Sequence, residues 1–355
     1  SALIRLFGSS QSAKTEPLMF SKSTWHYQRS RGSWGSIFPE TGPITLVPPW
    51  LLWLLVIQVI TFVTLPITIS LFRWLPDRGI ALARPLGLLL VAWLTWISAS
   101  IGLMDFSKST ILLAILSVSL ASSYLIYRNR RTILSTVKQR LKYFLGLEAL
   151  FLLAFFTFLI IRSANPDLWH PWRGGEKPMD LAYLTAIVKS STMPPYDPWY
   201  AGGYINYYYF GQFIIGVLVK VTGIVPAIAY NLAIPLLFGL TITGSFSIGY
   251  NATETLRRST YPKMSGNSTI TAGIVTAILV TVVGNLDGAL QLIVNGLHWV
   301  NGEAISQFDY WRSSRMMPGQ IVITEFPFWS FLFADLHSHV ISIPFTLMTL
   351  CLILN

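Results

Sequence analysis

Long apolar runs recur along this sequence, each close in length to the thickness of a membrane. A helix that crosses the hydrocarbon core needs about 20 mainly apolar residues, and lipid admits only helices and closed barrels as spanning structures. Only 11% of the residues are charged, against about 25% in soluble domains. The sequence therefore predicts an all-α polytopic membrane protein. About seven transmembrane helices are visible, over residues 50–72, 85–104, 110–127, 143–161, 225–250, 270–284 and 340–355.

Basic residues in the short loops indicate the orientation of these spans. Loops 73–84 and 128–142 are rich in arginine and lysine, which favours the cytoplasmic side. The run 207–222 is short and carries two polar residues. If it crossed the membrane, the basic loop with Arg257 and Arg258 would lie outside. We therefore predict that this run is an amphipathic helix in the outer membrane interface.

Two long polar loops then share the outer face. These loops cover residues 162–209 and 285–339, so that every segment capable of chemistry lies on one side of the membrane. The N-terminal polar segment, residues 1–49, falls on that side as well, although its own basic charge favours the opposite side. We expect this segment to be partly disordered. We also expect the chain to be part of a longer protein whose C-terminal part is missing.

Candidate catalytic acids lie in the first outer loop. Pro178 suits the first turn of a helix, so we expect a helix over 178–189, with Glu176 just before it and Asp180 in its first turn. A carboxylate there can take a proton from a hydroxyl group, or it can simply complement the helix dipole. Asp167 is a third candidate, which a turn next to Pro166 would also explain.

The second outer loop offers acids, histidines and arginines. Asp335, His337 and His339 alternate with other residues at the start of the last span, and ionisable residues entering a membrane are functional candidates. One regular helix cannot direct all three at one metal ion, whereas an irregular backbone can. Asp335 is the candidate metal ligand, and a divalent ion is the possible cofactor. Structural histidines remain the alternative.

Two further groups suit a sugar or phosphate ligand. Arg312 and Arg315 can bind phosphate, unless they pair with Glu325 or with anionic lipid. Asn206 precedes three aromatic residues, Tyr207, Tyr208 and Tyr209. Sugar rings stack on such residues, but an interfacial aromatic belt also explains them. These residues, together with Glu325, His337 and His339, form the predicted substrate-binding set.

Several separated motifs resemble one family, the uncharacterised "YYY" integral membrane proteins. They are Gly174-Gly-Glu-Lys-Pro-Met-Asp180, Asn206-Tyr-Tyr-Tyr-Phe-Gly211, Thr324-Glu-Phe-Pro-Phe328, Asp335-Leu-His337 and Leu75-Pro-Asp-Arg-Gly79. The likeness runs from about residue 50 to the end. Ser338 stands where the resemblance implies proline, and that is a small departure.

The layout is similar to that of the GT-C class of membrane glycosyltransferases. The resemblance implies a GT-C-like core over 143–355, an added three-span module over 50–127, and a catalytic acid at Glu176 or Asp180. It further implies transfer of a sugar from a polyprenyl-phosphate donor to an acceptor, at the extracytoplasmic face of a prokaryotic plasma membrane. Membrane lipid is a further expected partner. Nucleic acid is not an expected partner, because no binding pattern for it is present. A non-catalytic subunit of a larger membrane complex and a lipid or solute transporter are the alternatives.

Overall fold

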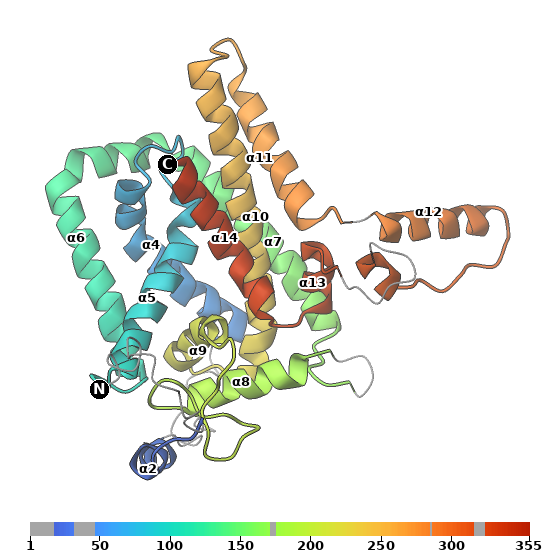
Figure 1. Cartoon of the computed structure of the whole chain (residues 1–355). Coiled ribbons are helices and arrows are strands. Elements are labelled where there is room, and N and C mark those ends of the chain that lie inside the picture. Colours follow the sequence, from blue (N-terminus) through green and yellow to red (C-terminus); the bar gives the residue numbers. More distant parts are fainter. Residues whose placement is uncertain (1–17, 32–46, 171–174, 285, 316–323) are drawn as a thin grey trace, which may run out of the picture.

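The computed structural model describes residues 18–31, 47–170, 175–284, 286–315 and 324–355. These residues form helices, short 3-10 turns and two isolated β-bridges, which confirms the all-α prediction (Figure 1). The helices in chain order are α2 (Lys22–Arg31), α4 (Pro49–Leu71), η2 (Ile80–Leu82), α5 (Ala83–Ser100), α6 (Lys108–Gln139), α7 (Leu141–Ala164), α8 (Lys177–Lys189), α9 (Phe210–Thr222), α10 (Pro226–Ser259), α11 (Gly266–Thr281), α12 (Asp287–Val300), η3 (Trp311–Ser314), α13 (Pro327–Phe333) and α14 (Ser338–Leu354).

Five segments among the described residues are helical, long and apolar enough to cross a membrane. They are Pro49–Leu71, Ile80–Ser100, Lys108–Gln139, Leu141–Ala164 and Pro226–Ser259. The other two predicted spans are also apolar helices, but α11 has only 16 residues and α14 only 17. The chain is therefore an integral membrane protein with five long spans and further shorter apolar helices.

Helix α10 is the central helix of the bundle. In its most apolar stretch 89% of the residues are buried, whereas the corresponding share is 28% in both α6 and α7. α10 packs against α7, α11 and α14. The long helices at the edge of the bundle thus expose apolar side chains, as expected of helices that face lipid.

Helix α9 is covered by other helices. At 13 residues it is too short to span, as expected. Its middle residues, from Gln212 to Val219, are all buried, and it packs against α4, α5, α6, α8 and α10. Its predicted place in the outer membrane interface stays a prediction. Helix α12 exposes many apolar side chains and extends away from the bundle (Figure 1).

The polar loops meet at one end of the bundle, opposite the end that contains the C-terminus (Figure 1). The N-terminal helix α2 lies at that polar end, because Tyr27 and Arg31 both bind the carboxylate of Asp105, at 2.6 and 3.1 Å. Gln28 also donates a hydrogen bond to Thr192 in the first long loop. The described residues 18–31 of the N-terminal segment therefore lie beside this loop, and the predicted side of the membrane stays a prediction. Its predicted disorder concerns mainly residues 1–17 and 32–46, outside the described residues.

Candidate active site

Glu176 stands at the start of α8, as the sequence predicts. It is the residue before the first helical position, and its carbonyl oxygen accepts the first helical bond, from the Asp180 N–H at 2.9 Å. Gly175 before it has a φ of +61°, and a Cβ atom there would lie 2.5 Å from a carboxylate oxygen of Asp335. A glycine is required at this position because α8 approaches the turn after α13 so closely.

Asp335 connects this turn to α8. One carboxylate oxygen accepts the backbone N–H of Glu176 at 3.0 Å, and the other lies 3.0 Å from the Lys177 ammonium. Both side chains of this ion pair are buried, with 5% and 9% of their surface exposed. The turn is also held by α10, because the Leu336 N–H donates to the hydroxyl of Tyr230 at 2.8 Å. Asp335 is therefore a structural anchor that fixes the position of Glu176.

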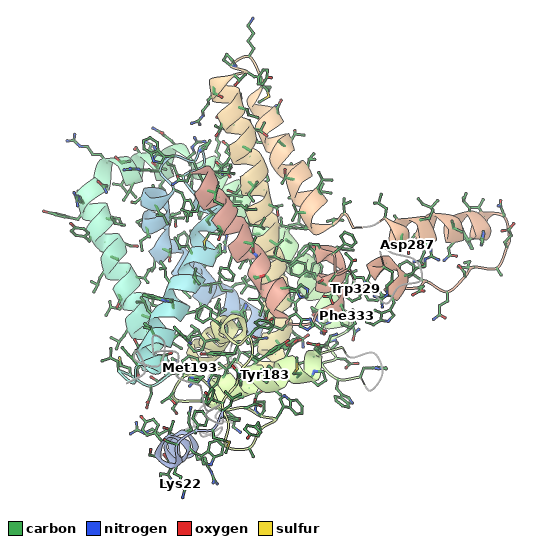
Figure 2. All side chains as sticks on the ribbon, in the orientation of Figure 1. Lys22, Tyr183, Met193, Asp287, Trp329 and Phe333 are labelled. Atoms are coloured by element: carbon green, nitrogen blue, oxygen red, sulfur yellow. The ribbon has the colours of Figure 1, made fainter. Side chains whose placement is uncertain are left out.

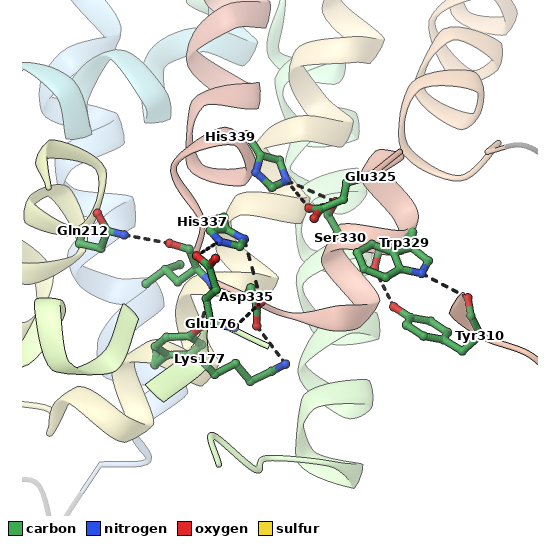
Figure 3. A network of polar contacts seen from close by, with 12 residues as sticks. Glu176, Lys177, Gln212, Tyr310, Glu325, Trp329, Ser330, Asp335, His337 and His339 are labelled. Carbon is green, nitrogen blue, oxygen red and sulfur yellow. Dashed lines mark hydrogen bonds and ion pairs between the residues drawn. The ribbon is translucent and has the colours of Figure 1, made fainter. Parts of the chain in front are cut away.

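The two histidines lie side by side because the backbone is not yet helical at His337. This residue has an extended conformation, with φ −66° and ψ 150°, and α14 begins only after it. The two imidazole rings are 5.3 Å apart. His337 forms a hydrogen bond with Glu176, and His339 lies 2.9 Å from Glu325 (Figure 3). The backbone at His337 is thus irregular, which is the condition under which Asp335, His337 and His339 were expected to meet.

The charges of this cluster influence one another. Burial alone would lower the pKa of His337, but its bond to Glu176 and the nearby carboxylates of Asp180 and Asp335 outweigh that effect and raise it. The bond with His339 lowers the pKa of Glu325. Below the raised pKa of His337, the Glu176–His337 contact is therefore a charged pair.

Asp180 lies beneath the cluster, with 2% of its surface exposed. Burial raises the pKa of its carboxyl from 3.8 to about 7, with smaller contributions from Asp335 and Glu176 and an opposing one from His337. A carboxyl group with such a pKa can exchange a proton near neutral pH. Unlike Glu176, however, Asp180 does not line the open cavity described next.

An open cavity of about 530 Å³ lies over the cluster. Its lining consists of Glu176, Tyr207, Tyr208, Glu325, His337, Ser338 and His339. Six of these residues belong to the predicted site, and they come from three separate parts of the chain. Tyr207 and Tyr208 expose much of their rings, whose centroids are 4.6 Å apart. The cavity thus combines a carboxylate, imidazoles and aromatic faces, which suits a polar ligand with ring surfaces.

A buried arginine marks the junction of two further cavities. Arg162, at the end of α7, is 4% exposed and donates two hydrogen bonds to the side-chain oxygen of Asn231, at 3.0 and 2.6 Å. It lines a polar cavity of about 710 Å³ shared with Asp167 and Lys177. It also lines a mainly apolar groove of about 560 Å³ between α4, α7 and α10. Among the described residues, no carboxylate lies within ion-pair distance of this guanidinium group.

Some predicted site residues lie apart from the cluster. Arg312 pairs with Asp287 at 2.9 Å. Asp287 is the first residue of α12, which extends away from the bundle and is called here the projecting arm (Figure 2). Arg315 lies over the ring of Trp311, at 5.9 Å from the ring centroid. The hydroxyl of Tyr209 accepts a bond from Trp96 at 2.9 Å and points into the bundle. The predicted roles of Arg312, Arg315 and Tyr209 in substrate binding therefore stay predictions. The remaining members of the set, Asn206 and Asp167, lie in the loop before α9 and in the cavity beside Arg162.

The structure places the predicted metal ligand, Asp335, in an ion pair, so its role in metal binding stays a prediction. Asp335 is engaged by Lys177 and by the backbone, whereas the residues whose donor atoms come close enough to share an ion are Glu325, His337 and His339. The donor atoms of these three residues lie within 4.8 Å of one another. Alternation of polar residues pointed to Asp335, but its side chain turns towards α8.

The sequence analysis also missed residues that contact the cluster. Lys177 is part of a quoted motif but carried no predicted role, and its ammonium lies 4.0 Å from the ring centroid of Phe333. Phe333 stacks on Trp329, with centroids 5.0 Å apart, and Trp329 stacks on Tyr310 (Figure 2). Trp329 and Phe333 are four residues apart in α13, whereas Tyr310 lies 19 residues before Trp329, so only the high aromatic content of residues 308–333 gave a signal for the whole stack.

Comparison with known proteins places the chain in a family. A family model described as "Uncharacterized membrane protein (DUF2298)" matches residues 90–355, which is most of the chain. The chain belongs to this family. No curated protein and no solved structure matches it. The prediction of an uncharacterised membrane protein family is thus confirmed, with a match that begins inside α5 instead of near residue 50. The similarity to GT-C enzymes stays a prediction.

The buried carboxyl of Asp180 leads to a pH-dependent prediction. Because its folded-state pKa is raised to about 7, the folded protein retains a proton that the unfolded chain releases above 3.8. Stability should therefore fall as the pH rises from about 4 to about 7. We expect Asp180→Asn to remove this fall. The Tm of the variant minus the Tm of the native protein should therefore be about 4 °C larger at pH 8 than at pH 5. The exposed Glu303→Gln serves as the control. A difference in Tm that does not change with pH would contradict this assignment.

Proposed function

We propose that this protein is a membrane glycosyltransferase that moves a sugar from a polyprenyl-phosphate donor to an acceptor hydroxyl. The observation that carries the proposal is the cavity in which Glu176 faces Tyr207 and Tyr208 beside two histidines. A transferase of this kind needs a base, a surface for a sugar ring and a nearby site for a lipid phosphate. We assign the base to Glu176, the sugar surface to Tyr207 and Tyr208, and the phosphate site to Arg162.

The chemistry requires one proton transfer and one exchange of bonds. The Glu176 carboxylate takes the proton of the acceptor hydroxyl, whose oxygen forms a bond to the anomeric carbon. The bond between that carbon and the phosphate oxygen breaks, and polyprenyl phosphate leaves with its negative charge. The tyrosine faces hold the sugar ring, and His337 and His339 orient the phosphate or hold a cation beside it.

Glu176 is a better candidate for the base than Asp180. Glu176 lines the cavity and leaves half of its side chain exposed, so an acceptor can reach it. Asp180 is buried, and its raised pKa leaves it partly protonated at neutral pH. Asp180 and Asp335 therefore support the base by position and charge.

The apolar groove beside Arg162 suits the prenyl chain of the donor. Its walls include Trp50, Leu159, Leu181 and Leu232, and it ends at the buried guanidinium group. The charges of Asp167 and Asp335 act on Arg162, but no described carboxylate forms an ion pair with it. A buried cation without such a pair costs free energy unless an anion accompanies it. We assign the donor phosphate to Arg162, with Arg312 and Arg315 as predicted contacts from the second loop. The layout similar to GT-C enzymes also supports this proposal, as an analogy.

A binding and turnover experiment tests the proposal. The protein in lipid nanodiscs is mixed with polyprenyl phosphate, which every such donor shares, and then with a panel of polyprenyl-phosphate hexoses. We expect polyprenyl phosphate to bind and Arg162→Gln to weaken this binding about tenfold or more. With an acceptor alcohol added, we expect one donor to be consumed as its sugar passes to the alcohol and polyprenyl phosphate is released. The control is Arg130→Gln, an exposed position on α6. If polyprenyl phosphate does not bind, the proposal fails regardless of the sugar.

A divalent cation fits the three residues Glu325, His337 and His339. Two imidazoles and one carboxylate are a donor set that Zn²⁺ and Mn²⁺ accept. When bound, such an ion supplies positive charge to the leaving phosphate. We expect the purified protein to bind about one equivalent of Zn²⁺, and His339→Ala to weaken this binding about tenfold or more. His298→Ala, on the projecting arm, should bind like the native protein, and equal binding by all three proteins would contradict the site.

A further inference from the structure

The opposite end of the bundle contains an unusual loop between α4 and η2. Arg78 and Gly79 both have a positive φ, 59° and 67°. This conformation is uncommon for a residue with a long side chain and costs about 1 kcal/mol or more. Backbone strain of this kind persists only where the surrounding structure enforces it. The strain therefore indicates that the loop holds Arg78 in a defined position.

A buried carboxylate holds this loop in place. Asp77 is fully buried and accepts hydrogen bonds from the Gly79 N–H and from the hydroxyls of Ser247 and Tyr143, at 2.8, 2.8 and 3.0 Å. Its own N–H donates to Asn251 at 2.9 Å. The loop is thus bonded to α7 and α10, and the backbone at Arg78 has little freedom.

Four arginines surround a small cavity next to this loop. Arg73 and Arg78 come from the loop, Arg140 from the junction of α6 and α7, and Arg258 from the last turn of α10. The cavity, called here the arginine pocket, has a volume of about 150 Å³, and Thr136 and Gln139 add polar groups. Such a volume suits a phosphate group.

The charge of the arginine pocket is only partly neutralised by the protein. Arg258 pairs with Glu254 at 2.8 Å, but Glu254 also binds Arg257. Arg140 donates to the hydroxyl of Tyr250 at 3.2 Å, which is a neutral partner. Within the described ranges, no carboxylate lies within ion-pair distance of Arg73, Arg78 or Arg140. The four arginines line one small cavity, where their like charges repel one another. The arrangement therefore favours an anion with several negative oxygens.

An apolar groove continues from the arginine pocket between α7, α10 and α11. It has a volume of about 810 Å³ and shares Gln139, Arg140 and Arg258 with the arginine pocket. Its walls are formed by apolar side chains such as Leu147, Leu150 and Ile274. A long apolar groove that ends in a cluster of arginines is complementary to a molecule with a hydrocarbon chain and an anionic head.

We propose that this groove and the arginine pocket bind an anionic phospholipid, with an acyl chain along α7 and the phosphate among Arg73, Arg78, Arg140 and Arg258. This site is separate from the candidate active site and does not depend on its function. It would couple the protein to anionic membrane lipid through a defined position, in addition to the general attraction of basic loops to such a surface.

The test compares lipid classes and two kinds of variant. Native mass spectrometry of the purified full chain measures binding of phosphatidylglycerol and phosphatidylcholine. We expect phosphatidylglycerol to bind about tenfold more tightly, and the double variant R78Q/R140Q to lose this preference. The matched control R130Q/R131Q removes the same charge from exposed positions of α6 outside the pocket, and it should retain the preference.

A second variant distinguishes a lipid from a free phosphate. Gly146 lines the groove, and a Cβ atom there would meet nothing within 4 Å, so a side chain can be added at this position. Gly146→Phe is chosen to place a ring in the groove. We expect this variant to lose phosphatidylglycerol binding while R130Q/R131Q keeps it. If Gly146→Phe binds lipid like the native protein, or if inorganic phosphate at millimolar concentration displaces phosphatidylglycerol, the lipid assignment is overturned. Equal binding by R78Q/R140Q and the native protein would overturn the phosphate site itself.

Discussion

Replacing Glu176 by glutamine should reduce the rate of sugar transfer by about 10³-fold. The glutamine has nearly the same shape, and it can still form a hydrogen bond with His337, so the cavity should keep its geometry. What the variant loses is the ability to take a proton from the acceptor hydroxyl. Because the loss concerns the transition state, kcat should fall while binding of the donor stays close to that of the native protein.

Two controls make the effect of Glu176→Gln specific. Glu303→Gln removes an exposed carboxylate between α12 and η3, outside the cavity, and should transfer sugar at the native rate. Asp180→Asn keeps the cavity lining intact and should lower the rate less than Glu176→Gln does. A larger loss in Asp180→Asn than in Glu176→Gln would transfer the role of base to Asp180, the other acid that the sequence predicted.

Replacing Asp335 by alanine should destabilise the fold by about 3–5 kcal/mol, because a buried charge pair loses one partner. The Lys177 ammonium, whose side chain is 9% exposed, would lose its carboxylate. The Glu176 N–H would lose its acceptor. Thermal unfolding in detergent measures the effect, and Glu176 should also lose its fixed position, so that catalysis falls with stability.

The double variant D335L/K177M separates the ion pair from the general effect of substitution. It replaces both charges with apolar side chains of similar volume, a change that is often nearly neutral when both partners are removed. The methionine can still contact the ring of Phe333. We expect the double variant to be more stable than Asp335→Ala. Equal destabilisation of the two variants would show that the pair does not determine stability at this turn.

Much of this architecture could be predicted from local properties of the sequence. The long spans follow from apolar length alone, and the start of α8 follows from Pro178 and the acids around it. Loop charge predicted that the segments with residues 176–180 and 335–339 share a side of the membrane, and the structure brings them into contact. These predictions succeeded because each depends on a short stretch of chain and on the membrane, without knowledge of packing.

Features that only packing decides could not be predicted. The buried bond of Gln212 in α9 to the carbonyl of Leu336, at 3.1 Å, is one of them. The pairing of Arg312 with Asp287, 25 residues away, is another. The pair of Lys177 and Asp335 joins residues far apart in sequence. Which polar group meets which partner depends on the three-dimensional arrangement, and residue type alone does not specify it.

The central claim is that a lipid-linked sugar binds between the groove beside Arg162 and the cavity at Glu176. The most direct measurement is a cryo-EM structure in lipid nanodiscs with a non-hydrolysable polyprenyl-phosphate sugar. The account predicts density for the phosphate within hydrogen-bond distance of the Arg162 guanidinium group. The sugar should lie against Tyr207 and Tyr208, with its anomeric carbon facing Glu176. Density for the donor elsewhere on the protein, with the groove filled by side chains or ordinary lipid, would contradict the account.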